Sequence, residues 1–378
     1  MAELPHSERK EAFASAKAMV RIAMAQQQIR WFGGANSEHG FISYYDELFS
    51  DLQYIYILKG GPGTGKSYLM RRCAEEAASR GIQAEEVYCS SDASSLDGVI
   101  LREVGIGILD GTAPHMLDPD LPAVHGEILN LGAYWDKGCL LSHADKIRAL
   151  CRQKAELYRK VYSMTEIYGK LKRDADMLVS PAVNTEKTES VAERIMRRFR
   201  DGAGFRLSTR QISSVGMWGK TDFTTLRDNA QHRISVSDKY ETGHLFLRAL
   251  IREARKKKLH TLVSYHPICA DREQELFFPE LRLSVYVGSE GGRGEEKHIN
   301  MQRFIDRQYI ASHRNELRLR FGLEKELYTA IEALFVRIRE THFELETYYT
   351  NAMDFGKKSR EDRAFLAALF DALPKHSS

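Results

Sequence analysis

The chain of 378 residues is 43% hydrophobic and 28% charged, which is typical of a soluble globular protein large enough for two domains. Its 55 basic and 52 acidic residues leave a formal charge of +3, so we expect neither a nucleic-acid partner nor an anionic membrane surface as partner. The five cysteines form no Cys-x-x-Cys pair and no apolar stretch is long enough to span a bilayer, so we expect a cytoplasmic protein without disulfides or a zinc site.

Residues 1–30 are expected to form an N-terminal helix, followed by a P-loop NTPase core over residues 31–136. Within this core, residues 54–58 are β-branched and aromatic, which indicates a buried strand. The strand leads into Gly60-x-x-x-x-Gly65-Lys66-Ser67, which matches the Walker A pattern at every fixed position. A helix is predicted to follow and to end at Gly81, a residue suited to a helix C-terminus.

Each residue type of this loop suits the binding of a triphosphate. Glycines let successive backbone N–H groups point at phosphate oxygens, and the helix N-terminus adds roughly half a positive charge. Lys66 would reach the β- and γ-phosphates, and the Ser67 hydroxyl would ligate Mg²⁺. ATP and Mg²⁺ are the predicted cofactors, because the chain has no guanine-reading Asn-Lys-x-Asp motif. The expected nucleotide-binding residues are Gly60, Gly61, Pro62, Gly63, Thr64, Gly65, Lys66, Ser67 and Tyr68.

Two carboxylates are candidates for the chemistry beside this loop. An apolar run over residues 104–109 ends in Asp110, and in P-loop folds a carboxylate at such a strand tip orients Mg²⁺. We expect Asp110 to be a metal partner and, with Lys66, a catalytic residue, although an aspartate before a glycine also simply opens turns. Asp92, which follows an earlier predicted strand, is the candidate base. Gly111 stands where many ATPases carry a water-positioning glutamate, so water activation has to come from elsewhere.

The second half of the chain repeats the first. Thr64-Gly65-Lys66-Ser67 aligns with Thr242-Gly243-His244-Leu245 and, at nearly the same spacing along the chain, Leu109-Asp110 aligns with Tyr286-Val287. The phosphate-binding lysine and both metal ligands are therefore lost together. This joint loss supports their common role and predicts a degenerate second core that does not bind Mg·NTP in the usual way. That core could still offer an arginine to the γ-phosphate or have no catalytic part, and the candidates are Arg206, Arg210, Arg248 and Arg282.

Long charged stretches with apolar residues at helical spacing follow each core. We expect a helical arm over residues 137–179, a polar linker over 180–192, the degenerate P-loop-like core over 193–309 and a C-terminal helical arm over 310–378. The fold class is thus a duplicated α/β fold, with mainly parallel sheets flanked by helices and the two copies forming an intramolecular pseudo-dimer. The arms would pack against one another or the cores, or bind a protein partner.

The run Lys59-Gly-Gly-Pro-Gly-Thr-Gly-Lys-Ser67 is identified as a member of the P-loop NTPase superfamily. Three further segments, Phe32-Gly-Gly-Ala, Cys89-Ser-Ser-Asp-Ala-Ser-Ser-Leu-Asp97 and Ile108-Leu-Asp-Gly-Thr-Ala-Pro-His115, resemble a poorly characterised bacterial family of tandem P-loop ATPases. The resemblance implies two nucleotide-binding units per chain, each with a helical arm. His244 and Leu245 depart from the family's second loop, so the resemblance does not imply two working sites here.

These observations predict an ATP-binding protein with one competent site, most simply a slow Mg²⁺-dependent ATPase that acts as a switch. One alternative is a kinase that transfers the γ-phosphoryl group to a small molecule or nucleotide, with Asp92 as base and the loop over residues 112–135 as acceptor site. A further alternative is a nucleotide-sensing scaffold without turnover.

Overall fold

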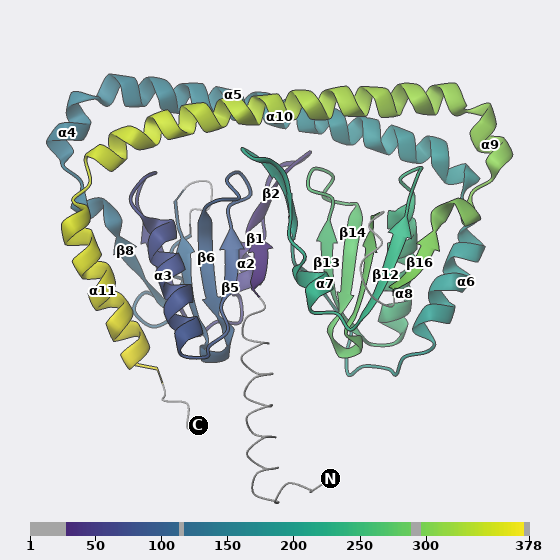
Figure 1. The fold of residues 1–378 in the computed structure, drawn as a ribbon, viewed down its shortest axis with the longest axis horizontal. Coiled ribbons are helices and arrows are strands. Elements are labelled where there is room, and N and C mark those ends of the chain that lie inside the picture. The colour runs from purple at the N-terminus through teal and green to yellow at the C-terminus, as the bar shows by residue number, and fades with distance from the viewer. Residues whose placement is uncertain (1–27, 113–116, 289–295, 374–378) are drawn as a thin grey trace, which may run out of the picture.

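The computed structural model describes residues 28–112, 117–288 and 296–373, which form two similar halves bridged by two long helices (Figure 1). Most of the N-terminal helix expected over residues 1–30 lies outside the described residues. The last residues of that range are not helical but begin strand β1 (Ile29–Phe32). The alternation of a charged residue with the apolar Ile29 and the aromatic pair Trp31 and Phe32 suits a strand better than a helix.

The first half contains a six-stranded sheet in which five strands run in the same direction. Only β6 is antiparallel to its two neighbours, β5 and β7. In spatial order the strands are β1, β5 (Glu85–Tyr88), β6 (Leu96–Leu101), β7 (Ile106–Asp110), β4 (Tyr54–Lys59) and β8 (Gly126–Asn130). The Walker A loop therefore leaves a strand inside the sheet, between β7 and β8.

The second half contains a sheet with the same strand order and the same single antiparallel strand, here β14. This agreement confirms an internally duplicated α/β fold with mainly parallel sheets. In matching order the strands are β9 (Arg206–Thr209), β13 (His260–Tyr265), β14 (Glu273–Phe278), β15 (Leu283–Val287), β12 (His232–Ser237) and β16 (Glu296–Asn300).

The outer face of each sheet is covered by two helices (Figure 1). On the first sheet these are α3 (Lys66–Ser79) and α11 (Phe355–Asp371), and on the second α8 (Gly243–Lys256) and α6 (Thr185–Met196). The helices bury apolar residues at helical spacing against the strands, as Leu366, Leu369 and Phe370 of α11 do in the first core. Burial of these apolar faces is the main force that holds each layer together.

The two sheets face each other across the short helices α2 (Tyr45–Phe49) and α7 (Thr225–Asp228). One hydrophobic cluster spans this interface, because it joins Trp31 and Val87 of the first half to Leu226 and Phe277 of the second. The Phe32 and Phe223 rings also stack here, with centroids 4.6 Å apart. The halves therefore share a core instead of being separate domains on a flexible connection.

Two hairpins cross this interface in opposite directions. The hairpin of β2 (Gly34–Ser37) and β3 (Gly40–Ser43) reaches the second half, where the Glu38 N–H donates to the Ile268 carbonyl at 2.9 Å. The hairpin of β10 (Ser213–Gly216) and β11 (Gly219–Asp222) reaches the first half, where the Met217 N–H donates to the Ser91 carbonyl at 2.7 Å. Each half thus contributes to the carboxyl end of the other half's sheet.

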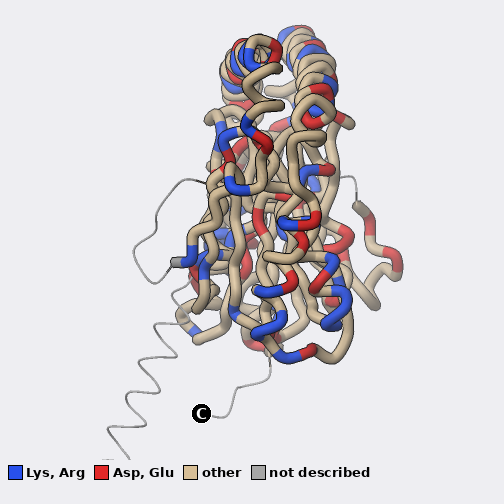
Figure 2. Tube along the Cα trace, turned by 90° about the vertical axis from the view of Figure 1, so that its right-hand side faces the viewer, with Lys and Arg blue, Asp and Glu red and all other residues tan. Residues whose placement is uncertain are grey.

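The segments expected as helical arms form α4 (Lys137–Ser142) with α5 (Ala144–Val179), and α9 (Arg307–Ser312) with α10 (Arg314–Asn351). Helices α5 and α10 lie side by side across the carboxyl ends of both sheets (Figure 1). Their amphipathic faces pack on each other and on the two hairpins below, and their outer faces carry interspersed acidic and basic residues (Figure 2).

Each long helix carries the chain from one half to the other. Trp135 of the first half forms a β-bridge with Met353, which follows α10, and Ile305 of the second half forms the equivalent bridge with Val183, which follows α5. The two helical layers are therefore exchanged, so that α11 covers the first sheet and α6 covers the second.

The prediction that residues 180–192 form an irregular linker is wrong. The segment forms the 3₁₀ helix η3 (Ser180–Ala182) and most of α6, in which Ala192 is fully buried. Its polar residues lie mainly on the exposed face of an amphipathic helix, and Pro181 stands in the first turn of η3, where a proline is tolerated. In the part of the chain that the structure describes, no helix combines the length and the apolar character needed to cross a membrane.

Candidate functional site

The Walker A residues form a tight loop between β4 and α3. Gly63 and Gly65 adopt positive φ angles of 70° and 77°, a conformation that glycine adopts at the lowest cost. Gly65 is the N-cap residue of α3, which begins at Lys66. This geometry places the first N–H groups of a 14-residue helix at the loop, where they can donate to an anion.

Lys66 and Ser67 emerge from the first turn of α3 toward the strand tips. The Lys66 ammonium donates to the carbonyls of Gly60 and Gly61 at 2.7 and 2.8 Å, and it lies 3.6 Å from the Asp110 carboxylate. The Ser67 hydroxyl oxygen accepts from the Leu96 N–H at 2.9 Å. The structure thus brings the predicted phosphate-binding lysine and the two predicted metal ligands to one place.

Asp110 is the last residue of β7, which runs parallel to β4 beside the loop. Its carboxylate accepts from the N–H of Thr112 at 2.9 Å and from the Thr112 hydroxyl. Burial raises the pKa of Asp110, the nearby Lys66 ammonium lowers it and the Asp97 carboxylate raises it further. A second positive charge beside Asp110 would favour its ionised form.

The oxygen atoms at this point fit Mg²⁺. A serine hydroxyl and an aspartate carboxylate are hard oxygen ligands of the kind that Mg²⁺ prefers. Among the described residues, no group of three or more His, Cys, Asp or Glu side chains could hold a metal ion. The residues of the protein that would hold Mg²⁺ are therefore Ser67 and Asp110, and the remaining ligands would come from phosphate and water.

A cavity of about 710 Å³ opens above the loop. Its floor includes residues 60–67, Asp97 and Asp110, and its walls come from α5, α10 and the β10–β11 hairpin of the second half. Its volume suits a small-molecule ligand. The wall residues from outside the first core are Cys151, Lys154, Ala155, Tyr158, Tyr162, Met217, His342 and Glu346.

The exchanged helices also hold the loop itself. In α10, the Glu346 side chain lies against the loop, since a Cβ at Gly63 would be 3.1 Å from its Cγ. Burial and the Asp92 carboxylate raise the pKa of Glu346, whereas Lys66 lowers it. In α11, the Lys358 ammonium donates to the Gly65 carbonyl at 3.1 Å and pairs with Asp362. The loop is therefore in direct contact with elements that follow the second half in sequence.

Two other predicted site residues, Asp92 and Tyr68, are not part of the cluster formed by Lys66, Ser67 and Asp110. Asp92 lines the cavity, but its carboxylate accepts from the Ser94 N–H at 3.0 Å and from the Trp218 indole at 2.7 Å. Through these bonds Asp92 anchors the β10–β11 hairpin to a loop of the first half. The role of Asp92 as a base stays a prediction. Tyr68 is 56% exposed on α3 and is not among the described residues that line the cavity.

The helix residues at the cavity were not foreseen from the sequence. Lys154, His342 and Glu346 belong to segments that looked like solvated charged arms, and no local motif marks them. Their positions follow only from the exchange of the helical layers between halves. The sequence repeat between the two long helices could have indicated these three residues, because it aligns each of them with a charged residue of the other helix.

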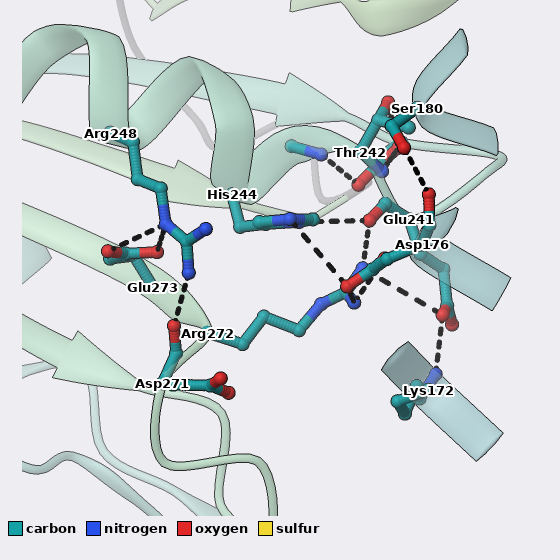
Figure 3. Close-up of polar contacts among 12 residues, drawn as sticks. Lys172, Asp176, Ser180, Glu241, Thr242, His244, Arg248, Asp271, Arg272 and Glu273 are labelled. Carbon is teal, nitrogen blue, oxygen red and sulfur yellow. Dashed lines mark hydrogen bonds and ion pairs between the residues drawn. The ribbon is translucent and has the colours of Figure 1, made fainter. Parts of the chain in front are cut away.

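The corresponding place in the second half is filled by the protein's own charges (Figure 3). Asp238, directly after β12, accepts hydrogen bonds from the Thr242 N–H at 2.7 Å and from the Gly243 N–H. Arg272 forms two 2.7 Å bonds with the Asp176 carboxylate and also donates to the Glu241 carbonyl. A side-chain carboxylate thus occupies the N-terminus of α8, the end of a helix that favours negative charge.

The structure shifts the alignment of the first half's loop with the second half's loop by one residue from the alignment expected from the sequence. Strands β4 and β12 begin at Tyr54 and His232, and the helices that follow them, α3 and α8, begin at Lys66 and Gly243. The interval from strand to helix is thus one residue shorter in the second half. Lys66 therefore corresponds to Gly243 and Ser67 to His244. The second half lacks the lysine and the hydroxyl in this register as well.

None of the four arginines considered for the first site, Arg206, Arg210, Arg248 and Arg282, lies among the described residues that line its cavity. Arg248 pairs with Glu273 at 2.8 Å (Figure 3), and Arg210 lies 3.7 Å from Glu47.

Comparisons of the chain with protein-family models, curated proteins and solved structures gave no match, so the geometry and chemistry of this site are the basis for inferring its function.

Proposed function

We propose that the first half binds ATP with Mg²⁺ in the 710 Å³ cavity and hydrolyses it slowly, as a switch acting on α5 and α10. The observation that carries the proposal is the convergence at the loop. A glycine-rich turn with two positive φ angles leads into Lys66, whose ammonium lies 3.6 Å from the Asp110 carboxylate. This is the constellation that phosphoryl transfer requires, with cationic and N–H donors next to a carboxylate that can orient a metal.

The chain's residues have distinct tasks in this proposal. The N–H groups of the loop and of the first turn of α3 would bind the phosphates, and Lys66 would exchange its bonds to loop carbonyls for phosphate oxygens. Ser67 and Asp110 would hold Mg²⁺, which supplies charge neutralisation between the β- and γ-phosphates when bound. A guanine-reading motif is absent from the sequence, which favours adenine.

In the hydrolytic step, a water oxygen forms a bond to the γ-phosphorus while the bond from that phosphorus to the ADP oxygen breaks. The products are ADP and inorganic phosphate, and the proton from water is released to solvent. Gly111 follows Asp110 in place of a water-positioning glutamate. Asp92 is already bonded to Ser94 and Trp218. Asp97 lies near Asp110, but its carboxylate accepts a hydrogen bond from the buried Tyr45 hydroxyl at 2.9 Å. Slow turnover is the expected consequence, because the carboxylates near the metal position are already engaged by the protein.

The contact between Glu346 and Gly63 supports the idea of a switch. The Glu346 side chain lies against Gly63, since a Cβ at Gly63 would be 3.1 Å from the Glu346 Cγ, and the N–H groups of this loop would donate to phosphate oxygens. A bound phosphate and the Glu346 carboxylate would therefore lie close together, and their like charges would repel. Glu346 is on α10, which extends over both halves (Figure 1), so phosphate binding would be coupled to the position of a long helix.

The test is release of phosphate from Mg·ATP in water by the wild type and by Asp110→Ala, followed over hours. The proposal predicts slow release that is lost in the variant. Release only when a small acceptor is added would instead favour the kinase alternative. Binding of ATP without any release of phosphate would favour the alternative of a nucleotide-sensing scaffold.

A further inference from the structure

The two long helices carry equivalent charged positions at the two sites. Helices α5 and α10 begin at Ala144 and Arg314, and the residues of the β-bridges that flank them repeat at the same spacing along the chain. In this register Lys154 corresponds to Glu324, and His342 corresponds to Lys172. The exchange of helices places one member of each pair over the first site and the other over the second.

In the second half these positions neutralise each other. The Lys172 ammonium lies 2.6 Å from the Glu324 carboxylate. It also contacts Glu241 of the degenerate loop (Figure 3). The side chains of Lys172 and Glu324 are each only 6% exposed. A buried ion pair of this kind needs no ligand, because each charge has its counter-charge within the protein.

In the first half the equivalent pair has lost its negative member. Lys154 takes the place of the glutamate, and within the described residues it has neither an ion pair nor a side-chain hydrogen bond. His342 takes the place of the lysine, and its Nδ1 is buried without a hydrogen-bond partner among those residues. Both side chains line the cavity with Lys66. Burial lowers the pKa of Lys154, as expected for an ammonium without a carboxylate partner.

The carboxylates of the cavity have partners other than Lys154. Asp92 accepts from Ser94 and Trp218, Asp110 accepts from Thr112, and Asp97 accepts from the Tyr45 hydroxyl. The cation that lowers the pKa of Glu346 is Lys66. A half-buried ammonium that lines a cavity without a counter-charge favours an anionic ligand, because an unpaired buried charge is costly. The missing negative charge is therefore expected on the ligand.

The position of Lys154 indicates which part of the ligand it meets. Lys154 lines the cavity together with Cys89 and interacts with it electrostatically. Cys89 follows β5, and the strand order runs β5, β6, β7, β4. The loop after β4 would hold the first phosphates, and the metal pair at Asp110 on β7 would hold the last two. Lys154 thus lies farther along the same direction, toward the terminal phosphate.

We propose that Lys154 contacts the terminal phosphate group of the bound nucleotide, and that this contact makes the site prefer a triphosphate to a diphosphate. The assignment rests on the proposed nucleotide site. It makes α5, which is tied to the second half by the contact of Lys172 with Glu241, the element that responds to the presence of the γ-phosphate.

The test is calorimetric titration of the full chain with Mg·ATP and with Mg·ADP, for the wild type, Lys154→Ala, Lys154→Arg and Lys160→Ala. Lys160 is on the same helix, and its exposed side chain pairs with Glu156, so it is the matched control. Loss of one charge-assisted contact predicts at least about a tenfold lower ATP affinity for Lys154→Ala. ADP affinity is expected to stay within about threefold of wild type, and Lys154→Arg is expected to restore most of the ATP preference.

A double variant, Lys154→Glu with His342→Lys, installs the charge pair of the second half in the first site. It is expected to fold, as judged by circular dichroism, and to lose most ATP binding, because the cavity cation is then neutralised internally. Equal weakening of ATP and ADP by Lys154→Ala, or no weakening, overturns the role of Lys154 while the nucleotide site stands. Failure of the wild type to bind either nucleotide overturns the proposed function and this inference together.

Discussion

The Lys66 ammonium and the Asp110 carboxylate lie 3.6 Å apart, although they come from a loop and a strand that are well separated in the sequence. The contact forms because β7 pairs in parallel with β4, with Leu58 opposite Asp110. Parallel pairing brings the carboxyl ends of both strands to one edge of the sheet. The Lys66 ammonium and the Asp110 carboxylate therefore lie together at the N-terminus of α3, the end of a helix that favours anions.

Replacement of Asp110 by Asn should abolish the Mg²⁺ dependence of ATP binding. The amide keeps the shape but removes the charge that would hold the metal, so affinity with Mg²⁺ should fall at least about tenfold, to the level measured with EDTA. Titration calorimetry with and without Mg²⁺ measures this. Asp120→Asn is the control, because that side chain is 75% exposed. A variant that still binds more tightly with Mg²⁺ would exclude Asp110 as a metal partner.

Gly63→Ala should destabilise the fold more than Gly81→Ala does. Both glycines have similar positive φ angles, 70° and 75°, so both variants carry a backbone cost of about 1 kcal/mol. A Cβ at Gly63 would also lie 2.4 Å from the Thr350 hydroxyl, whereas a Cβ at Gly81 meets no described atom within 4 Å. Chemical denaturation should show an additional loss of about 1 kcal/mol or more for Gly63→Ala. Equal losses would mean that α10 does not rest on the loop.

The neutral His342 should contribute a loss of stability as the pH falls from about 6.5 to 4, and His342→Gln should remove this contribution. Burial lowers the pKa of His342 to about 4, with Lys154 and Lys66 acting in the same direction and Asp92 against it. Between the two pKa values the unfolded chain binds a proton that the folded chain does not, so acidification favours unfolding. The slope of the unfolding free energy against pH should fall by at most about 1.4 kcal/mol per pH unit.

Denaturation curves at several pH values provide this measurement, with His232→Gln at an exposed position as the control. His244 contributes in the same direction, because burial lowers its pKa to about 3. Some acid sensitivity should therefore remain in the His342 variant. An unchanged slope would show that His342 is not held in its neutral form.

The exchange of helical layers predicts that α11 stabilises the first half. Leu369 is 4% exposed and packs in the first core with α3, so Leu369→Ala should cost about 2–4 kcal/mol of unfolding free energy. Leu141→Ala, at a position that is 73% exposed, should cost less than about 0.5 kcal/mol. A small effect of both variants would indicate that α11 does not belong to that core.

The sequence predicted the elements whose signals are local. The Walker A loop, the strand before it and the tip of β7 carry short motifs, and the duplication is visible because equivalent segments repeat in order. Strand β6 was not foreseen, because Asp97 and Gly98 interrupt its apolar run. The structure shows why they are accepted there, since Gly98 lies against Phe49 and Asp97 is buried with a bond from Tyr45.

The exchange of the helices between the two halves could not be predicted from the sequence, for a different reason. Residues 180–192 are polar enough to suggest a linker, and only their packing beside α8 reveals a helix. The charges of α5 and α10 look solvated in isolation. Their roles depend on which half each helix end covers, which is decided by long-range contacts such as the Trp135–Met353 bridge.

The measurement that tests the central claim most directly is calorimetric titration of the full chain with Mg·ATP, for the wild type, Lys66→Ala and His244→Ala. We predict one site per chain that is lost in Lys66→Ala and kept in His244→Ala. Two sites per chain, or a single site that survives Lys66→Ala, would contradict a competent first half paired with a degenerate second half.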